Sequence, residues 1–184
     1  MLADMPGLPL IEPETAAGEA ASLLAATQQA LGVTPNMAKA MANSPAALKG
    51  YLDFSSALRR GSLPAAMRER IALVVAQETG CDYCLSAHTY TGTKVAGLTE
   101  AEAARARKGQ AGDPWAAAVL AFAAALLGGH GTVGDDELDA ARDGGLSHAQ
   151  VAEVVAHVAL NIFTNYFTKA ARVDIDWPLV RHTD

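Results

Sequence analysis

Apolar side chains recur at spacings of three and four residues along most of the chain, which is the periodicity of an α-helix. No segment shows the strict alternation of apolar and polar residues that is typical of a β-strand. Glycines, prolines and capping residues divide the pattern into about eight helices. The expected helices cover residues 15–31, a stretch that begins at 34–35, 45–61, 64–80, 81–95, a stretch that begins at 99, 113–128, 135–142 and 147–172. The pattern therefore predicts an all-α protein.

Several helix starts are marked by side chains that can cap the free N–H groups of a first turn. Thr34 before Pro35 and Ser44 before Pro45 combine an N-cap residue with proline at the first helical position. Two further starts are capping boxes, in which a hydroxyl residue and the residue three positions later cap each other. These boxes are Thr99 with Glu102 and Ser147 with Gln150. These starts fix where the helices begin more firmly than periodicity alone.

The composition fits one ordered domain built from close-packed helices. The chain has 184 residues, of which 51% are hydrophobic, 18% charged and only 5% aromatic. Alanine is abundant, which favours close approach of helices. Residues 1–13 contain Pro6, Pro9 and Pro13, and we expect them to form an extended N-terminal arm. Residues 14–184 are then expected to form a single helical domain.

The charge of the chain argues against some binding partners, and its hydropathy indicates its cellular compartment. The formal net charge is −6, and the chain lacks a basic stripe, which argues against binding to nucleic acid or to an anionic membrane. The first residues lack the basic and apolar regions of a signal peptide, and no run of eighteen apolar residues occurs. We therefore expect a cytoplasmic protein. No Gly-x-Gly-x-x-Gly motif follows a strand, and we expect no flavin, haem, nicotinamide or other cofactor.

The only two cysteines, Cys81 and Cys84, lie three residues apart at the expected start of a helix after Gly80. So close a pair cannot join distant parts of the fold, and in a reducing compartment it indicates redox chemistry or metal binding. The free N–H groups and positive dipole end of a first helical turn stabilise a thiolate. The position therefore favours a reactive dithiol.

Two residues at fixed distances from the cysteines complete a candidate proton relay. His88 lies four residues after Cys84, so both should occupy one face of the helix with Cys81. Glu69 belongs to the preceding helix, whose residues 71–76 are apolar on all sides and should be buried. A carboxylate beside His88 would orient the ring and raise its basicity. The expected relay runs from Glu69 to His88, directly or through water, and on to Cys84.

The spacing Glu-x(11)-Cys-x-x-Cys-x-x-x-His, formed here by Glu69, Cys81, Cys84 and His88, resembles the signature of the AhpD-like alkylhydroperoxidases in the carboxymuconolactone decarboxylase superfamily. The likeness extends through residues 68–76 and 83–89. It implies an AhpD-like helical bundle and a thiol peroxidase that forms trimers or hexamers. By this resemblance Cys84 attacks the peroxide, Cys81 resolves the sulfenic acid as a disulfide, and His88 and Glu69 move the proton. The substrates would be organic hydroperoxides or hydrogen peroxide, and the reductant a lipoyl-type or thioredoxin-like dithiol.

One position departs from the best-known members of that family. They carry a histidine immediately before the second cysteine, whereas this chain has Tyr83. The change removes one titratable group and resembles the peroxidase-related subgroup. Tyr83 either packs in the core or lines the substrate pocket.

Other interpretations remain open at this point. The last long helix carries a polar row of His157, Asn161 and Asn165, which either lines the substrate pocket or makes structural hydrogen bonds, the second being favoured. The four motif residues could bind zinc, although helical spacing is unlike the usual zinc knuckle. A carboxymuconolactone decarboxylase-type lyase and a non-enzymatic redox sensor or thiol-disulfide partner are the alternative functions. Long Ala- and Val-rich helices also favour a homo-oligomer, in which the N-terminal arm could wrap a neighbour.

Overall fold

The structure, a computed structural model that describes residues 7–184, contains nine α-helices and no β-strand within that range. The helices are α1 (Gly18–Leu31), α2 (Asn36–Met41), α3 (Pro45–Arg59), α4 (Ala65–Glu78), α5 (Asp82–Lys94), α6 (Glu100–Arg107), α7 (Pro114–Gly128), α8 (Asp135–Asp143) and α9 (His148–Ala170). The predicted all-α class is confirmed. Among the described residues, no helix combines the length and apolarity needed to cross a membrane.

The predicted boundaries are wrong mainly near the N-terminus. The helix start predicted at Thr34–Pro35 corresponds to the six-residue α2, which begins at Asn36. Pro35 itself occupies its N-cap position, because the Thr34 hydroxyl donates to the Gln28 side chain at 3.0 Å instead of capping the helix. α1 begins at Gly18, since Thr15 lies in a turn and its hydroxyl donates to the carbonyl of Glu12.

The other capping predictions are confirmed. Ser44 accepts a hydrogen bond from the Ala47 N–H at 3.3 Å, with Pro45 at the first position of α3. Both predicted capping boxes form, at the starts of α6 and α9. These caps satisfy N–H groups that have no partner inside the helix, so each start is held by its own sequence.

The predicted N-terminal arm falls partly outside the described residues, because residues 1–6 belong to it. Residues 7–12 have no regular secondary structure. The Leu8 N–H donates to the carbonyl of Ala171 and the Ile11 N–H to that of Lys39, at 3.0 and 3.1 Å. This part of the arm therefore lies against its own chain.

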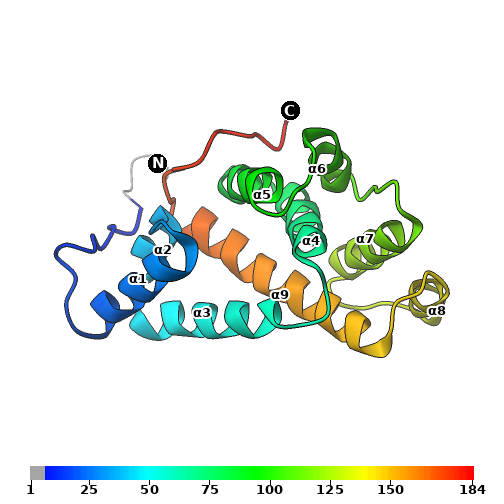
Figure 1. The fold of residues 1–184 in the computed structure, drawn as a ribbon, viewed down its shortest axis with the longest axis horizontal. Helices are drawn as coiled ribbons and strands as arrows, with labels where there is room; N and C mark the ends of the chain where they lie inside the picture. Colours follow the sequence, from blue (N-terminus) through cyan, green and yellow to red (C-terminus); the bar gives the residue numbers. More distant parts are fainter. Residues whose placement is uncertain (1–6) are drawn as a thin grey trace.

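α4 is the central helix of the fold. It packs against α5, α6, α7 and α9, and its residues 71–76 are all buried, as predicted. α9 runs diagonally beneath α4 and α5, while α1, α2 and α3 gather at one end and α6, α7 and α8 at the other (Figure 1). The first three helices enclose a smaller apolar cluster of their own, around Leu24, Met41 and Leu48. The central position of α4 brings its Glu69 beside α5.

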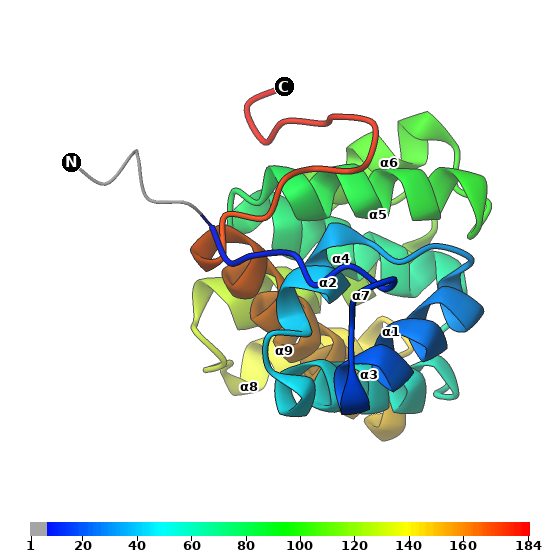
Figure 2. The same ribbon diagram turned by 90° about the vertical axis from the view of Figure 1, so that its left-hand side faces the viewer.

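Residues after α9 turn back over the molecule without forming a helix or strand. They cross α5 on the way to the C-terminus (Figure 2). The predicted end of the helical pattern before Pro178 is thus correct, and the residues that follow contact the helix that carries the cysteines.

Candidate functional site

The turn between α4 and α5 places both cysteines at the centre of the fold. Gly80 adopts φ +62°, in the left-handed region that favours glycine, and the Cys81 N–H then donates to the carbonyl of Ala76 at 2.9 Å. Cys81 becomes the N-cap of α5, and Cys84 lies in its first turn. The sequence predicted this position at the helix start, and Cys81 lies one residue before the first residue of α5.

The two sulfur atoms lie 2.7 Å apart, and both cysteines are unbridged. The Cys81 Sγ also accepts the backbone N–H of Cys84 at 3.2 Å, as an N-cap side chain does. Both residues are buried, with 1% and 3% of their surface exposed. A small further movement would join the sulfurs in a disulfide without rearranging the helix.

Thr168, on α9, is a member of the site that the sequence analysis missed. Its hydroxyl lies 3.2 Å from the Cys81 Sγ and 3.5 Å from the Cys84 Sγ. The sequence contained a signal for this residue. Thr168 follows His157 by eleven residues and Asn161 by seven, so all three lie on the same polar face of α9. Only the tertiary packing of α9 on α5 brings that face to the sulfurs.

The hydrogen bonds distribute the charge of the dithiol unequally. The Cys84 thiol, helped by the Thr168 hydroxyl and the Cys84 N–H, lowers the pKa of Cys81 to about 6 although burial acts against this. Burial and the neighbouring Cys81 raise the pKa of Cys84 well above its usual range. The directions of these pKa shifts favour ionisation of Cys81 over that of Cys84.

Glu69 and His88 form the predicted acid–base pair. The Glu69 Oε2 lies 2.8 Å from the His88 Nδ1 and accepts the hydroxyl of Thr91 at 2.6 Å. Burial disfavours the charged form of both groups, but their mutual attraction and hydrogen bond have the larger effect. The pKa of Glu69 is therefore lowered and that of His88 raised. Their side chains remain 22% and 26% exposed. The pair can exchange protons with solvent.

The second half of the expected relay is not a direct contact. Among the hydrogen bonds of residues 7–184, none joins His88 to the sulfur of Cys84 or Cys81. The charge of His88 nevertheless lowers the pKa of Cys81. His88 therefore acts on the dithiol through space or through an intervening molecule.

Tyr83 is buried, and its hydroxyl is hydrogen-bonded to two other segments of the chain. The hydroxyl accepts the Met37 N–H at 3.2 Å and the Trp177 Nε1–H at 3.4 Å. Burial, with the charge of Asp176, raises the pKa of Tyr83 above its usual range. The residue is therefore neutral and links α5 to α2 and to the C-terminal residues.

The polar row of α9 divides into two kinds of residue. Asn161 donates to the carbonyl of His157 at 2.8 Å, and Asn165 accepts the Thr79 hydroxyl at 2.7 Å, so both amides make structural hydrogen bonds. The His157 Nε2 is buried without a partner, and burial lowers the pKa of this ring to about 4. His157 is thus a neutral histidine with one free ring nitrogen.

The four motif residues are not arranged as a metal site. Zinc needs three or four ligands around one point. Within the part of the chain that the structure describes, no group of three or more His, Cys, Asp or Glu side chains converges in that way.

Comparison with known proteins gives one match to a family model. Residues 45–128, which carry Glu69, Cys81, Cys84 and His88, match the model of the carboxymuconolactone decarboxylase family. No curated protein sequence matches the chain.

Three solved structures share the fold. A peroxidase-related protein from Silicibacter sp. TM1040 is 21% identical, with a TM-score of 0.78 over 95% of this chain and 94% of that one. An AhpD-core peroxidase-related protein from Ralstonia eutropha JMP134 is 19% identical, with a TM-score of 0.80 over 96% and 94%. The debrominase Bmp8, solved as a cysteine-to-alanine variant in complex with 2,3,4-tribromopyrrole, is 20% identical, with a TM-score of 0.78 over 95% and 93%.

The chain has an AhpD-like helical fold. Residues 45–128 are thus similar to the carboxymuconolactone decarboxylase family, and the whole chain shares the fold of the peroxidase-related proteins. The resemblance seen in the sequence motif is confirmed.

Proposed function

We propose that this protein is a thiol-dependent peroxidase that reduces organic hydroperoxides or hydrogen peroxide. The observation that carries the proposal is the buried pair of free thiols at 2.7 Å, in which the pKa of Cys81 is lowered to about 6. Such a pair holds one thiolate and one thiol at neutral pH. That is the state needed for attack on a peroxide and for closure of a disulfide.

The first step is attack of the Cys81 thiolate on the terminal oxygen of the peroxide. The S–O bond forms as the O–O bond breaks, which gives a sulfenic acid and an alkoxide or hydroxide that takes a proton to leave as alcohol or water. The resemblance to the alkylhydroperoxidases assigned attack to Cys84, and the pKa pattern supports the reverse order. Both assignments use the same pair and differ in which serine variant traps the sulfenic acid.

The second step joins the sulfurs. The Cys84 sulfur, 2.7 Å away, attacks the sulfenic sulfur, and water leaves with the proton of the thiol. An external dithiol, of lipoyl or thioredoxin-like type, then exchanges with the disulfide and is itself oxidised. The overall reaction converts one peroxide and one dithiol into an alcohol or water, a second water and a disulfide.

The Glu69–His88 pair supplies the protons. A protonated His88, held by the carboxylate, can protonate the leaving oxygen and then recover a proton from solvent, because its side chain is partly exposed. The superfamily lyase and the non-enzymatic redox sensor remain the competing functions.

The most useful test is peroxide-dependent turnover with a panel of dithiols, with release of bromide from 2,3,4-tribromopyrrole and lactone decarboxylation measured in parallel. Sustained consumption of peroxide supports the proposal. Oxidation without turnover with any dithiol would support a sensor. Bromide release or decarboxylation without peroxide consumption would contradict the peroxidase assignment.

The expected homo-oligomer has a candidate surface on α9. Val155, Phe163 and Tyr166 lie on this helix with 44%, 41% and 62% of their surface exposed. An apolar face of this kind is typical of contacts between copies of a chain. We propose that a second copy covers it in the trimer or hexamer that the family resemblance implies, and that Tyr166→Glu weakens the assembly in sedimentation measurements.

A further inference from the structure

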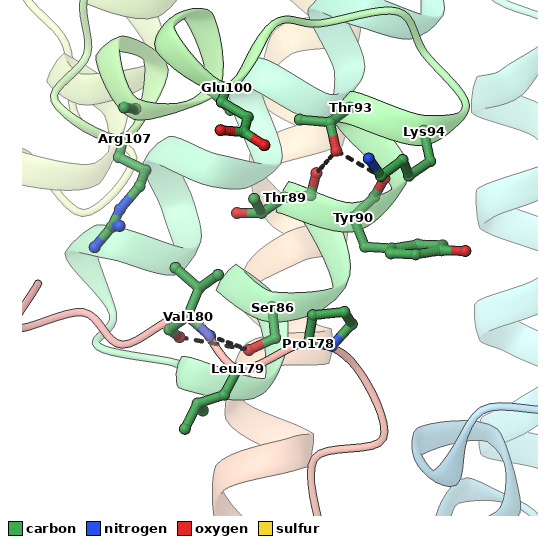
Figure 3. A pocket seen from close by; sticks show the side chains of 12 residues that line it. Ser86, Thr89, Tyr90, Thr93, Lys94, Glu100, Arg107, Pro178, Leu179 and Val180 are labelled. Carbon is green, nitrogen blue, oxygen red and sulfur yellow. Dashed lines mark hydrogen bonds between the residues drawn. The ribbon is translucent and has the colours of Figure 1, made fainter.

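The last residues of the chain have no regular secondary structure but make several specific contacts with α5. We refer to residues 174–184 as the C-terminal strap. The His182 N–H and ring Nδ1 both contact the Asp82 Oδ1, at 2.8 and 2.7 Å. The Val180 N–H donates to the Ser86 hydroxyl at 2.9 Å, and Figure 3 shows this contact. Two successive turns of α5 are therefore bound by the strap.

A third contact lies between these turns and the core. The Trp177 Nε1–H donates to the Tyr83 hydroxyl, and the Trp177 ring packs on Tyr90 with the ring centroids 5.3 Å apart. The strap also reaches α2, since the Asp176 carboxylate accepts the Asn36 N–H at 2.7 Å. Tyr83 is thereby held from the side of α2 and from the side of the strap.

The residues held by the strap surround the cysteines in the helix. Asp82 and Tyr83 are the first two residues of α5, between the N-cap Cys81 and Cys84. After the Cys84 thiol and the Thr168 hydroxyl, the Cys84 N–H also lowers the pKa of Cys81, and it points at that sulfur only while this first turn is helical. First turns lack backbone partners and fray more readily than helix interiors. Contacts from outside the helix that stabilise this first turn therefore also maintain the hydrogen bond to the Cys81 sulfur.

We propose that the C-terminal strap is a positioning element for the dithiol: its contacts with Asp82, Tyr83 and Ser86 hold the first turn of α5 so that the Cys84 N–H remains directed at the Cys81 sulfur. The inference rests on the proposed function only in naming Cys81 as the reactive thiolate. It assigns a role in the chemistry to residues nearly a hundred positions away, such as Trp177 and His182.

A cavity lies beside part of the strap, although Trp177 and Val180 pack against the core. A cavity of about 310 Å³ separates the strap from the middle of α5 and from α6. In Figure 3 the labelled side chains of Thr89 and Leu179 lie on opposite sides of this space. The contacts at Asp82, Tyr83 and Ser86 act together with hydrogen bonds from Arg107 to the carbonyl of Arg181 and from Gln77 to that of His182.

Other groups around the dithiol lie outside the strap. His88 on α5 and Thr168 on α9 lower the pKa of Cys81, and Lys169 on α9 lowers that of Cys84. Among the hydrogen bonds and ion pairs of residues 7–184, none joins these three groups to the strap, and Lys169 instead contacts the carbonyl of Thr79. Variants confined to the strap therefore leave these groups unchanged.

The test is a pH titration of the thiolate by its ultraviolet absorbance in the double variant Trp177→Phe/His182→Ala, with Cys81→Ser as the blank. At pH 6 about half of Cys81 should be thiolate in the unaltered protein, and the fraction should fall to about a tenth in the double variant. Leu179→Ala is the matched control, because this strap residue is 53% exposed and lacks a side-chain hydrogen bond. It should titrate like the unaltered protein.

An unchanged titration in a double variant with native circular dichroism would overturn the inference. If the double variant does not fold, Ser86→Ala answers the same question, because it removes the acceptor for the Val180 N–H without altering a charge. The titration needs no peroxide. A protein without peroxidase activity whose thiolate still depends on the strap would refute the proposed function and leave this inference standing.

Discussion

The sulfur pair and the acid–base pair of this site are built in opposite ways. Cys81 and Cys84 are buried, and their protons are distributed by contacts within the first turn of α5 and by Thr168. Glu69 and His88 keep about a quarter of their side-chain surface exposed and are bound mainly to each other. The structure therefore assigns sulfur chemistry and proton exchange to two separate pairs of residues. The buried cysteines set the reactivity of sulfur, and the partly exposed Glu69 and His88 exchange protons with water.

The largest effect should come from the sulfur pair. Cys81→Ser and Cys84→Ser should each reduce peroxide turnover by at least about a thousandfold, because neither variant can complete the disulfide. Cys84→Ser should also accumulate a sulfenic acid at Cys81, measurable by dimedone labelling and mass spectrometry. A sulfenic acid trapped only at Cys84 in Cys81→Ser would restore the order that the family resemblance implies.

The acid–base pair should give the next largest effect. Glu69→Gln removes the charge that raises the pKa of His88, so less of the imidazole is protonated at neutral pH. We expect kcat/KM for peroxide to fall by about a hundredfold, and His88→Ala to lose a similar amount. Thr91→Val is the matched control, since it removes only the second hydrogen bond to Glu69 and should cost much less. Equal losses in all three variants would contradict a proton-transfer role.

The smallest effect should come from Thr168, which tunes the sulfur without joining the reaction. Thr168→Val removes one of the hydrogen bonds that lower the pKa of Cys81. The sign follows from that direction: the rate of peroxide reaction falls as pH drops through the thiolate pKa, and a higher pKa moves the fall to higher pH. We expect the midpoint of the pH–rate profile to rise from about 6 by about one pH unit. Rates well above the midpoint should be unchanged. A uniform loss at every pH would indicate that Thr168 has another role.

The sequence predicts what its local chemistry determines. Ser44, Thr99 and Ser147 mark helix starts because each cap is made within three residues. The spacing of Cys81, Cys84 and His88 places the motif on one helix, and the apolar residues 71–76 identify the buried central helix that carries Glu69.

Contacts between distant segments could not be predicted in this way. Thr168 reaches the sulfurs from more than eighty positions away, and Trp177 reaches Tyr83 from a segment without any periodic pattern. Tyr83 left two alternatives open, because its sequence neighbours do not show where its hydroxyl points. The N-cap of α2 was predicted one residue too early, because the Thr34 hydroxyl contacts Gln28 on α1 and does not cap α2.

The central claim is that Cys81 and Cys84 form a peroxide-driven dithiol–disulfide couple. The most direct measurement is mass spectrometry of the peptide that contains both cysteines after treatment with one equivalent of peroxide. The account predicts a loss of two hydrogens confined to that peptide, which a dithiol then reverses. A peptide that remains fully reduced, with no sulfenic acid at either cysteine, would contradict it.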